Sequence, residues 1–280
     1  MTLSEQRTTN NDASWRLINS GPGTGSWNMA VDEAILEACI RGGVPPTLRI
    51  YSWQPPAISL GHFQPAEKAL FMEACRAQGI EAARRPTGGR AILHDKELTF
   101  SITVPLSLMG TQGVMDSYRY LAGGILGMMR HLNVPAELVD RNSQSPHANA
   151  AATQKGTPAA CFAVKARCDL MVYGKKIVGC AQVHRNEVVL QQNSLPFVIE
   201  AEKWQEVFQG MAGVGDEAIG LWEAARREVP FDEAAAALVA GFKEALGIKF
   251  VTGDLTEAER CRALELIPKI TALAAAPAAE

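Results

Sequence analysis

Two arginines open the part of this chain that is richest in chemically useful residues, RRPTGGRAILHD at positions 84–95. The guanidinium groups of Arg84 and Arg85 match the oxygens of a carboxylate or a phosphate, so an anion is one candidate ligand. The alternative is structural, with one arginine solvated and the other paired with a nearby acid such as Asp95 or Glu97. Taken alone, these residues favour the structural role.

The glycine pair and the histidine of the same stretch have open alternatives of their own. Gly88-Gly89 is either a plain turn or bare backbone that a ligand can approach closely. His94 and Asp95 are of the types found in a general base and its orienting carboxylate, but neighbours on a strand point to opposite faces. We therefore expect this pair to shape the turn into the following strand.

A cysteine nucleophile is the second chemical possibility, and Cys161 in GTPAACF is its candidate. An ordinary thiol, with a pKa of about 8.5, is only slightly ionised at neutral pH, so catalysis needs a nearby cation. Lys175, Lys176 and His184 follow in the next strand-rich stretch. The opposing interpretation is simple packing, because unreactive cysteines are among the most buried residues.

Metal and nucleotide sites are not expected. Cys161, Cys168, Cys180 and His184 fall within 24 positions, but the close cysteine pairs typical of zinc sites are missing there. The chain has no P-loop string, and AGGILGMM has the wrong spacing for a dinucleotide fingerprint.

The chain as a whole has 280 residues, of which 47% are hydrophobic and 20% charged, with a net charge of −3. This composition is typical of a globular protein, and the slightly acidic balance argues against a nucleic-acid partner. Apolar runs fall short of the roughly 18–20 residues of a membrane span, and the polar N-terminus does not look like a signal peptide. We expect a cytoplasmic protein with reduced thiols.

Periodicity and breaker residues predict a mixture of helices and strands. Helices are expected over 27–41 with Ser26 as N-cap, 66–78, 114–132, 201–210, 216–226 and 231–246. Strands are expected over 47–53, 57–63, 98–105, in a short segment running into Arg84, and as a three-strand meander over 168–195. The polar stretch 141–160 predicts a long loop, either functional or disordered. This order of elements predicts an α+β fold with a mixed β-sheet flanked by helices.

Three of these stretches together resemble one family. RRPTGGRAILHDKELTFS, GTPAACF and YGKKIVGCAQ are similar to the lipoate/octanoate cofactor transferases, which share a catalytic fold with lipoate–protein and biotin–protein ligases. WNMAVDEAIL and LRIYSWQPPAISLGHFQ extend the resemblance, which covers about residues 15–247. The resulting domain prediction is a disordered tail over 1–13, a single catalytic domain over 14–250, and a C-terminal helical extension and tail over 251–280. In that last part, residues 268–280 are expected to be frayed.

Details of the motifs resemble the octanoyltransferase type. The ATP-using ligases are similar but tend to have a third glycine where Arg90 stands here. The resemblance implies that Cys161 takes octanoyl from acyl carrier protein as a thioester and passes it to a lysine of the glycine-cleavage H protein or a lipoyl domain of a 2-oxoacid dehydrogenase. Lys176 would lower the pKa of the thiol. The donor carries phosphopantetheine, and neither ATP nor another cofactor is expected.

The same resemblance implies a narrow apolar tunnel for the acyl chain, with the glycine pair lying against it. The substrate-binding residues that it implies are Arg84, Arg85, Gly88, Gly89, Arg90 and His94. Candidate apolar walls are Ile58, Leu60 and Ile92.

Three alternatives remain. An octanoyl-H-protein amidotransferase has a similar cysteine and lysine, but usually lacks the Arg-Arg-Pro and His-Asp found here. An ATP-dependent lipoate–protein ligase would not need Cys161. A non-catalytic lipoyl-domain binder would keep the fold but form no acyl thioester.

Overall fold

Eleven strands and ten helices are found in residues 14–111, 113–140, 168–209 and 214–272, which this computed structural model describes. Eight strands form the larger sheet: β1 (Trp15–Gly23), β2 (Thr47–Trp53), β6 (Glu97–Pro105), β7 (Glu137–Asp140), β8 (Cys168–Val172), β9 (Lys175–Arg185), β10 (Val188–Pro196) and β11 (Phe250–Thr252). The smaller sheet contains β3 (Ala57–Leu60), β4 (Glu81–Arg84) and β5 (Ile92–His94). The longer helices are α1 (Gly25–Ile40), α5 (Val114–His131), α9 (Phe231–Leu246) and α10 (Glu257–Ala272). The short helices are α2 (Ala66–Ala69), α3 (Met72–Ala77), α4 (Leu106–Met109), α6 (Ala201–Val207), α7 (Val214–Glu217) and α8 (Leu221–Ala225).

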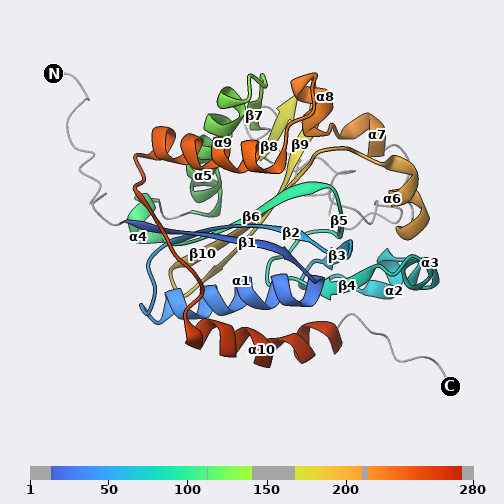
Figure 1. Cartoon of the computed structure of the whole chain (residues 1–280), viewed down its shortest axis with the longest axis horizontal. Helices are drawn as coiled ribbons and strands as arrows, with labels where there is room; N and C mark the ends of the chain where they lie inside the picture. Colours follow the sequence, from blue (N-terminus) through green and yellow to red (C-terminus); the bar gives the residue numbers. More distant parts are fainter. Residues whose placement is uncertain (1–13, 112, 141–167, 210–213, 273–280) are drawn as a thin grey trace.

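The larger sheet is mixed. Its strand order is β11-β1-β2-β6-β10-β9-β8-β7, and β1 runs parallel to both of its neighbours. All its other pairs are antiparallel. Helices α5 and α9 cover one face, while α1 and α10 cover the other (Figure 1). The predicted α+β class, with a mixed sheet flanked by helices, is confirmed.

Close packing between α5 and α9 explains the glycines that weaken the sequence pattern of the 114–132 helix. A Cβ atom added at Gly124 would lie 2.6 Å from the ring of Phe242, and one added at Gly127 would lie 2.6 Å from the carbonyl oxygen of Gly241. The two helices therefore approach one another more closely than larger side chains allow. Their apolar contacts belong to the main core, which also contains Phe100 of β6.

A buried carboxylate fixes α1 against the centre of the larger sheet. Asp32 has no exposed surface and accepts hydrogen bonds from Arg49 (2.8 Å) and Tyr51 (2.9 Å) of β2. Ser101 of β6 (2.8 Å) and Gln192 of β10 (2.7 Å) donate to it as well. Burial, and after it the charge of Asp32, raises the pKa of Tyr51 well above its usual value. Three strands and a helix thus meet at one carboxyl group.

A second buried ion pair connects α10 to β1. The two guanidinium NH₂ groups of Arg16, on β1, donate to Glu259 of α10 at 2.6 and 2.8 Å. The backbone and hydroxyl of Thr256 donate to the same carboxylate at 2.7 and 2.9 Å. Arg262 adds a partly exposed pair with Glu37 of α1. These contacts make α10 an integral layer of the fold.

Several predicted elements need correction. Helix α1 begins at Gly25, and its N-cap is Thr24 rather than Ser26, because the Thr24 hydroxyl accepts from the Trp27 amide at 3.3 Å. The single helix predicted over 66–78 is two short helices, because Leu70 between them is extended and bridges to Phe208.

The chain ends also differ from expectation. Residues 268–272 belong to α10 instead of a frayed tail, and Ile270 is buried there. Strands β1, β5, β7 and β11 were not predicted, since β5 has only three residues and the other three do not alternate their polarity clearly. The predicted tail over 1–13, the predicted loop over 141–160 and positions 273–280 of the predicted frayed end lie outside the described residues. Among the helices that could be assessed, none combines the length and apolar character needed to cross a membrane.

The buried pair between Arg16 and Glu259 predicts a pH-dependent contribution to stability. Burial acts to raise the pKa of Glu259, but hydrogen bonds from Arg16 and Thr256 lower it overall, below the ordinary value of 4.5. The stabilisation is therefore present above about pH 4.5 and lost as the pH falls through the lower folded-state pKa. We expect Glu259→Gln to reduce the free energy of unfolding at pH 7 by about 2–3 kcal/mol, measured by urea denaturation.

Two comparisons test whether this stabilisation comes from the buried pair between Arg16 and Glu259. The loss in Glu259→Gln should shrink as the pH falls below 4.5, because the carboxylate of the unfolded wild-type chain takes up a proton there and that of the folded protein follows at lower pH. Glu233→Gln, which breaks the surface pair with Arg227, should change the unfolding midpoint little. Equal losses in both variants at every pH would contradict the assignment.

Candidate active site

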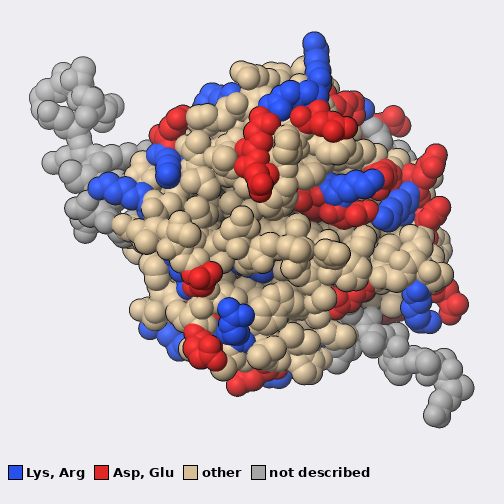
Figure 2. Space-filling view, in the orientation of Figure 1, with Lys and Arg blue, Asp and Glu red and all other residues tan. Residues whose placement is uncertain are grey.

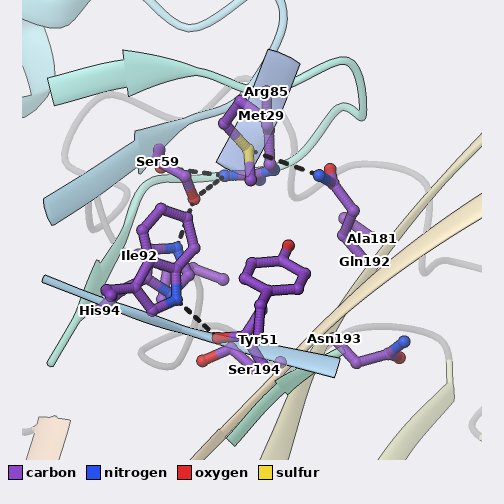
Figure 3. Close-up of a pocket in the computed structure, with 13 residues that line it drawn as sticks. Met29, Tyr51, Ser59, Arg85, Ile92, His94, Ala181, Gln192, Asn193 and Ser194 are labelled. Carbon is purple, nitrogen blue, oxygen red and sulfur yellow. Dashed lines mark hydrogen bonds between the residues drawn. The ribbon is translucent and has the colours of Figure 1, made fainter. Parts of the chain in front are cut away.

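A narrow cavity lies between the two sheets, beneath α1 (Figure 3). The empty space between its lining residues is about 270 Å³, including the part that opens to solvent. Its lining residues are Met29, Tyr51, Trp53, Ser59, Arg85, Ile92, His94, Thr99, Gly179, Ala181, Gln192, Asn193 and Ser194. Of the three predicted apolar walls, Ile92 lines the cavity. Ile58 and Leu60 were wrong, because they flank Ser59 on β3 and pack on the opposite side, in the core of the smaller sheet.

Polar side chains around this cavity are paired with one another. Nε2 of His94 lies 2.7 Å from the Ser59 hydroxyl, and Nδ1 lies 2.7 Å from the Glu97 carboxylate. The His94 ring also stacks on Trp53, with centroids 4.0 Å apart, and Ser194 donates to Glu97 at 2.7 Å. The hydrogen-bonding capacity of these groups is thus directed at other protein atoms, and a ligand in the cavity meets mainly carbon.

The predicted role of the His-Asp pair is only half correct. His94 does connect to the start of β6, but through Glu97, three residues along the chain. Asp95 instead pairs with Lys203. The reason is the strand geometry, which directs neighbouring side chains to opposite faces.

Arg85 holds the glycine turn in place. Its guanidinium is buried and donates to the carbonyl oxygens of Gly88 at 2.7 Å and Arg90 at 2.8 Å. Further bonds reach the Ser59 carbonyl at 3.0 Å and the Thr87 hydroxyl at 3.0 Å. Arg85 also contributes to the cavity wall, so it braces the loop and shapes the site at once.

Arg84 braces a different loop. One of its terminal nitrogens lies within hydrogen-bond distance of three carbonyl oxygens, those of Gly61 (2.7 Å), His62 (3.0 Å) and Gln64 (2.8 Å). The structural alternative stated from the sequence was therefore wrong in detail. Arg84 and Arg85 bind backbone carbonyls. Glu97 pairs with His94 instead, and Asp95 pairs with Lys203.

The two braced loops touch without any side chain between them. A Cβ atom at Gly61 would lie only 1.9 Å from the carbonyl oxygen of Gly89. Gly89 itself has φ of +93°, a conformation that favours glycine. Bare backbone is needed here for loop-to-loop contact, which the sequence did not reveal.

A second, more open pocket of about 660 Å³ adjoins the first, since Ala181 lines both. Its remaining lining residues are Gly88, Gly89, Val114, Met115, Tyr118, Cys168, Cys180 and Gln182. The glycine pair therefore lies at this outer pocket, while Arg85 and His94 line the inner cavity. Arg90 is half-buried and contributes its carbonyl to the bond with Arg85.

Lys176 is a buried cation with a buried partner. Its side chain is 7% exposed, and its ammonium nitrogen lies 2.9 Å from a carboxylate oxygen of Asp169, itself 2% exposed. A charge in the interior is costly unless it is paired, so Asp169 accounts for the position of Lys176. Lys175, the preceding residue of β9, is half-buried and projects to the other face of the strand.

The candidate nucleophile Cys161 lies outside the described residues. The described chain resumes at Cys168, which begins β8, lines the outer pocket and has a pKa raised by burial. His184, the other proposed activator, contacts Ser117 at 3.1 Å, and burial lowers its pKa. Among the described residues, no group of three or more His, Cys, Asp or Glu side chains is placed to hold a metal ion.

Comparison with known proteins decides the family. The model of the lipoyl protein ligase A/B catalytic domain matches residues 24–243. The chain belongs to this family. An octanoyltransferase LipM from Kyrpidia tusciae is 38% identical over 92% of this chain and 96% of its own. Another octanoyltransferase LipM, from Symbiobacterium thermophilum, is 39% identical over 91% of this chain and 95% of its own.

Solved structures of the family agree with the fold. A crystal structure of lipoate-protein ligase A bound with ATP superposes with a TM-score of 0.76 at 26% identity, covering 91% of this chain and 95% of that one. A protein from T. acidophilum with bound lipoic acid gives a TM-score of 0.73 at 26% identity over the same shares. The family resemblance identified from the sequence motifs is confirmed.

Sequence reasoning missed the residues that support the family motifs. Ser59, Thr87 and Gln192 connect Arg85 to the cavity and the sheet, and Asp169 holds Lys176. One signal was available. The polar run QQNS over 191–194 lies in a strand that is buried throughout, which indicates an internal polar network rather than a solvated surface.

The contact between the two braced loops predicts a sharp response to a single methyl group. We expect Gly61→Ala to displace the turn over 86–90 and to lower thermal stability, because the added Cβ meets backbone rather than a flexible side chain. The cost should be about 1–3 kcal/mol, as for other overpacked sites, measured by thermal unfolding. Gly88→Ala is the matched control, since a Cβ there meets nothing within 4 Å. Similar stability of both variants would show that the loops do not meet as described.

Proposed function

We propose that this chain transfers an octanoyl group from acyl carrier protein to the lysine of a lipoyl-accepting protein, through a thioester on Cys161. The observation that carries the proposal is an apolar-lined cavity to which β9, the strand of the buried Lys176, contributes Gly179 and Ala181. The chain is similar to octanoyltransferases over about nine tenths of its length. The acceptor is the glycine-cleavage H protein or a lipoyl domain of a 2-oxoacid dehydrogenase.

The inner cavity suits an unbranched acyl chain. Burying each methylene there stabilises the complex by about 0.8 kcal/mol. His94 is hydrogen-bonded to both Ser59 and Glu97. A hydrocarbon chain that enters the cavity therefore breaks none of these hydrogen bonds. Ala181, which lines both pockets, marks the passage from the cavity to the outer pocket, where the reacting carbonyl would lie.

Lys176 has two possible effects on the reaction, and the position of Asp169 limits one of them. An ammonium near the Cys161 sulfur favours the thiolate and lowers its pKa. The carboxylate 2.9 Å from that ammonium opposes the effect, so the thiolate benefits only if the sulfur lies closer to Lys176 than to Asp169. An ammonium group that reaches the thioester can also donate to the oxyanion that develops on its carbonyl.

The transfer balances in two steps. The Cys161 thiolate attacks the carbonyl of octanoyl-acyl-carrier-protein, an S–C bond forms, and the phosphopantetheine thiol leaves with a proton. The neutral amine of the acceptor lysine then attacks the enzyme thioester. An amide forms, the Cys161 sulfur is released, and the amine loses its proton. No nucleoside triphosphate enters, because the donor is already a thioester.

Direct detection of the thioester tests the proposal. The protein is incubated with octanoyl-acyl-carrier-protein in the absence of ATP and analysed by intact mass. One octanoyl adduct is expected, removable by hydroxylamine and mapped to Cys161, and Cys161→Ala should form none. Adduct formation that requires ATP would favour a ligase instead. Binding of lipoyl-accepting protein without any adduct would favour the non-catalytic alternative, and octanoyl-H-protein as the only effective donor would favour the amidotransferase.

Lys176 generates a second prediction. Lys176→Met should slow acylation of Cys161 about 100-fold, the scale of losing one oxyanion donor, measured by single-turnover mass spectrometry. Lys175→Met, one residue away on the other face of β9, is the matched control and should change the rate little.

A further variant separates chemistry from folding. Lys176→Met leaves the Asp169 carboxylate buried without its ammonium partner, which destabilises the fold. The double variant Lys176→Met/Asp169→Asn removes both charges, so it should regain thermal stability but remain slow. Recovery of the acylation rate in that double variant would show that the Lys176 ammonium is not needed for the reaction.

A further inference from the structure

A basic pocket lies next to the proposed active site and has no role in the scheme above. It has a volume of about 490 Å³ and is lined by His62, Arg84 and Arg185, with Leu266 and Ile270 of α10 as its apolar wall. The face shown in Figure 2 mixes acidic and basic side chains. The lining of the pocket, in contrast, contains three arginines and one acidic residue.

The charge balance of the pocket favours an anion. Arg84, Arg85 and Arg185 line it together with a single acid, Glu33. Arg185 pairs with that glutamate but stays 37% exposed, whereas Glu33 is 15% exposed. Guanidinium groups bind phosphate oxygens through paired N–H donors.

The pocket is rigid on one side. The Arg84 guanidinium is bonded to three carbonyls of the loop 61–64. This loop carries His62 and the 87% exposed Phe63, whose rings pack edge to face with centroids 4.6 Å apart. A preformed loop lowers the entropic cost of binding a partner, and an exposed aromatic ring beside a basic pocket suits a protein that carries an anionic group.

Two segments connect the basic pocket to the outer pocket of the active site. The chain from Arg84 to Gly89 lines the basic pocket at its start and the outer pocket at its end. Strand β9 does the same, with Ala181 at the outer pocket and Arg185 at the basic pocket. Four residues of strand separate these two positions by about 13 Å. An extended prosthetic arm with a phosphate at one end and a thioester at the other fits this arrangement.

We infer that the basic pocket binds the phosphate of the phosphopantetheine arm of the acyl donor, with Arg185 as its main ligand. The inference rests on the proposed function. The acceptor protein is the less suitable occupant, because it must bring a lysine to the same site and a cationic pocket repels that group. The donor brings a phosphodiester on an acidic protein, for which a basic patch is complementary.

Paired donors that differ only in the phosphate test this inference. Acylation of Cys161 is measured with octanoyl-acyl-carrier-protein, octanoyl-phosphopantetheine and octanoyl-pantetheine. Arg185→Gln should raise KM about tenfold for both phosphate-bearing donors and leave KM for octanoyl-pantetheine unchanged. Arg185→Lys should give a smaller rise, because it keeps the charge but loses the forked geometry. Arg227→Gln, which breaks the surface ion pair with Glu233 of α9, is the matched control and should change no KM.

Any other result with these donors contradicts the phosphate site, and the proposed octanoyl transfer is tested separately by the adduct on Cys161. An equal rise in KM for all three donors would show a local distortion, and no rise would show that Arg185 does not contact the phosphate. Slower transfer from the preformed S-octanoyl enzyme, with normal acylation, would assign the pocket to the acceptor. In all these cases the adduct on Cys161 still forms with octanoyl-pantetheine. Absence of the adduct with every donor would instead reject the proposed function.

Discussion

The carboxylate of Asp32 is the contact on which the geometry of this protein depends. It is fully buried on α1 and receives donors from β2, β6 and β10. One of those donors, Gln192, also accepts a 2.8 Å bond from the Thr87 hydroxyl, which in turn accepts from Arg85. The glycine turn and the central sheet are therefore joined by a continuous chain of buried hydrogen bonds. A buried charge needs all its donors, so no member of this chain can move alone.

This internal pairing has a consequence for the site. Polar residues surround the inner cavity, but their hydrogen bonds are made to one another, so the space that remains is suited to hydrocarbon. The same logic applies to Lys176, which is kept inside the protein by Asp169. Strand β9 contributes Gly179 and Ala181 to the lining of the inner cavity and also carries the buried Lys176.

The C-terminal helix belongs to this arrangement. The Arg16–Glu259 pair connects α10 to β1, and the Arg262–Glu37 pair connects it to α1. The apolar residues Leu266 and Ile270 of α10 line one side of the basic pocket. The loops that contact the substrate in our proposal are braced from behind by arginines acting on backbone carbonyls. Guanidinium groups suit this task because one group can bridge several acceptors in a plane.

Local patterns in the sequence determined much of this protein. Alternation and helical periodicity predicted β2, β6, the β8–β10 meander, α5 and α9, and the motif residues identified the family. What the sequence could not decide was which partner each polar group finds. Arg84 and Arg85 bond to carbonyls of segments both near and distant in the chain, and Glu97 rather than Asp95 orients His94. Such choices depend on which strands lie side by side. Only the tertiary structure brings β3, β5 and β10 to one cavity and places a carboxylate against a lysine from the next strand.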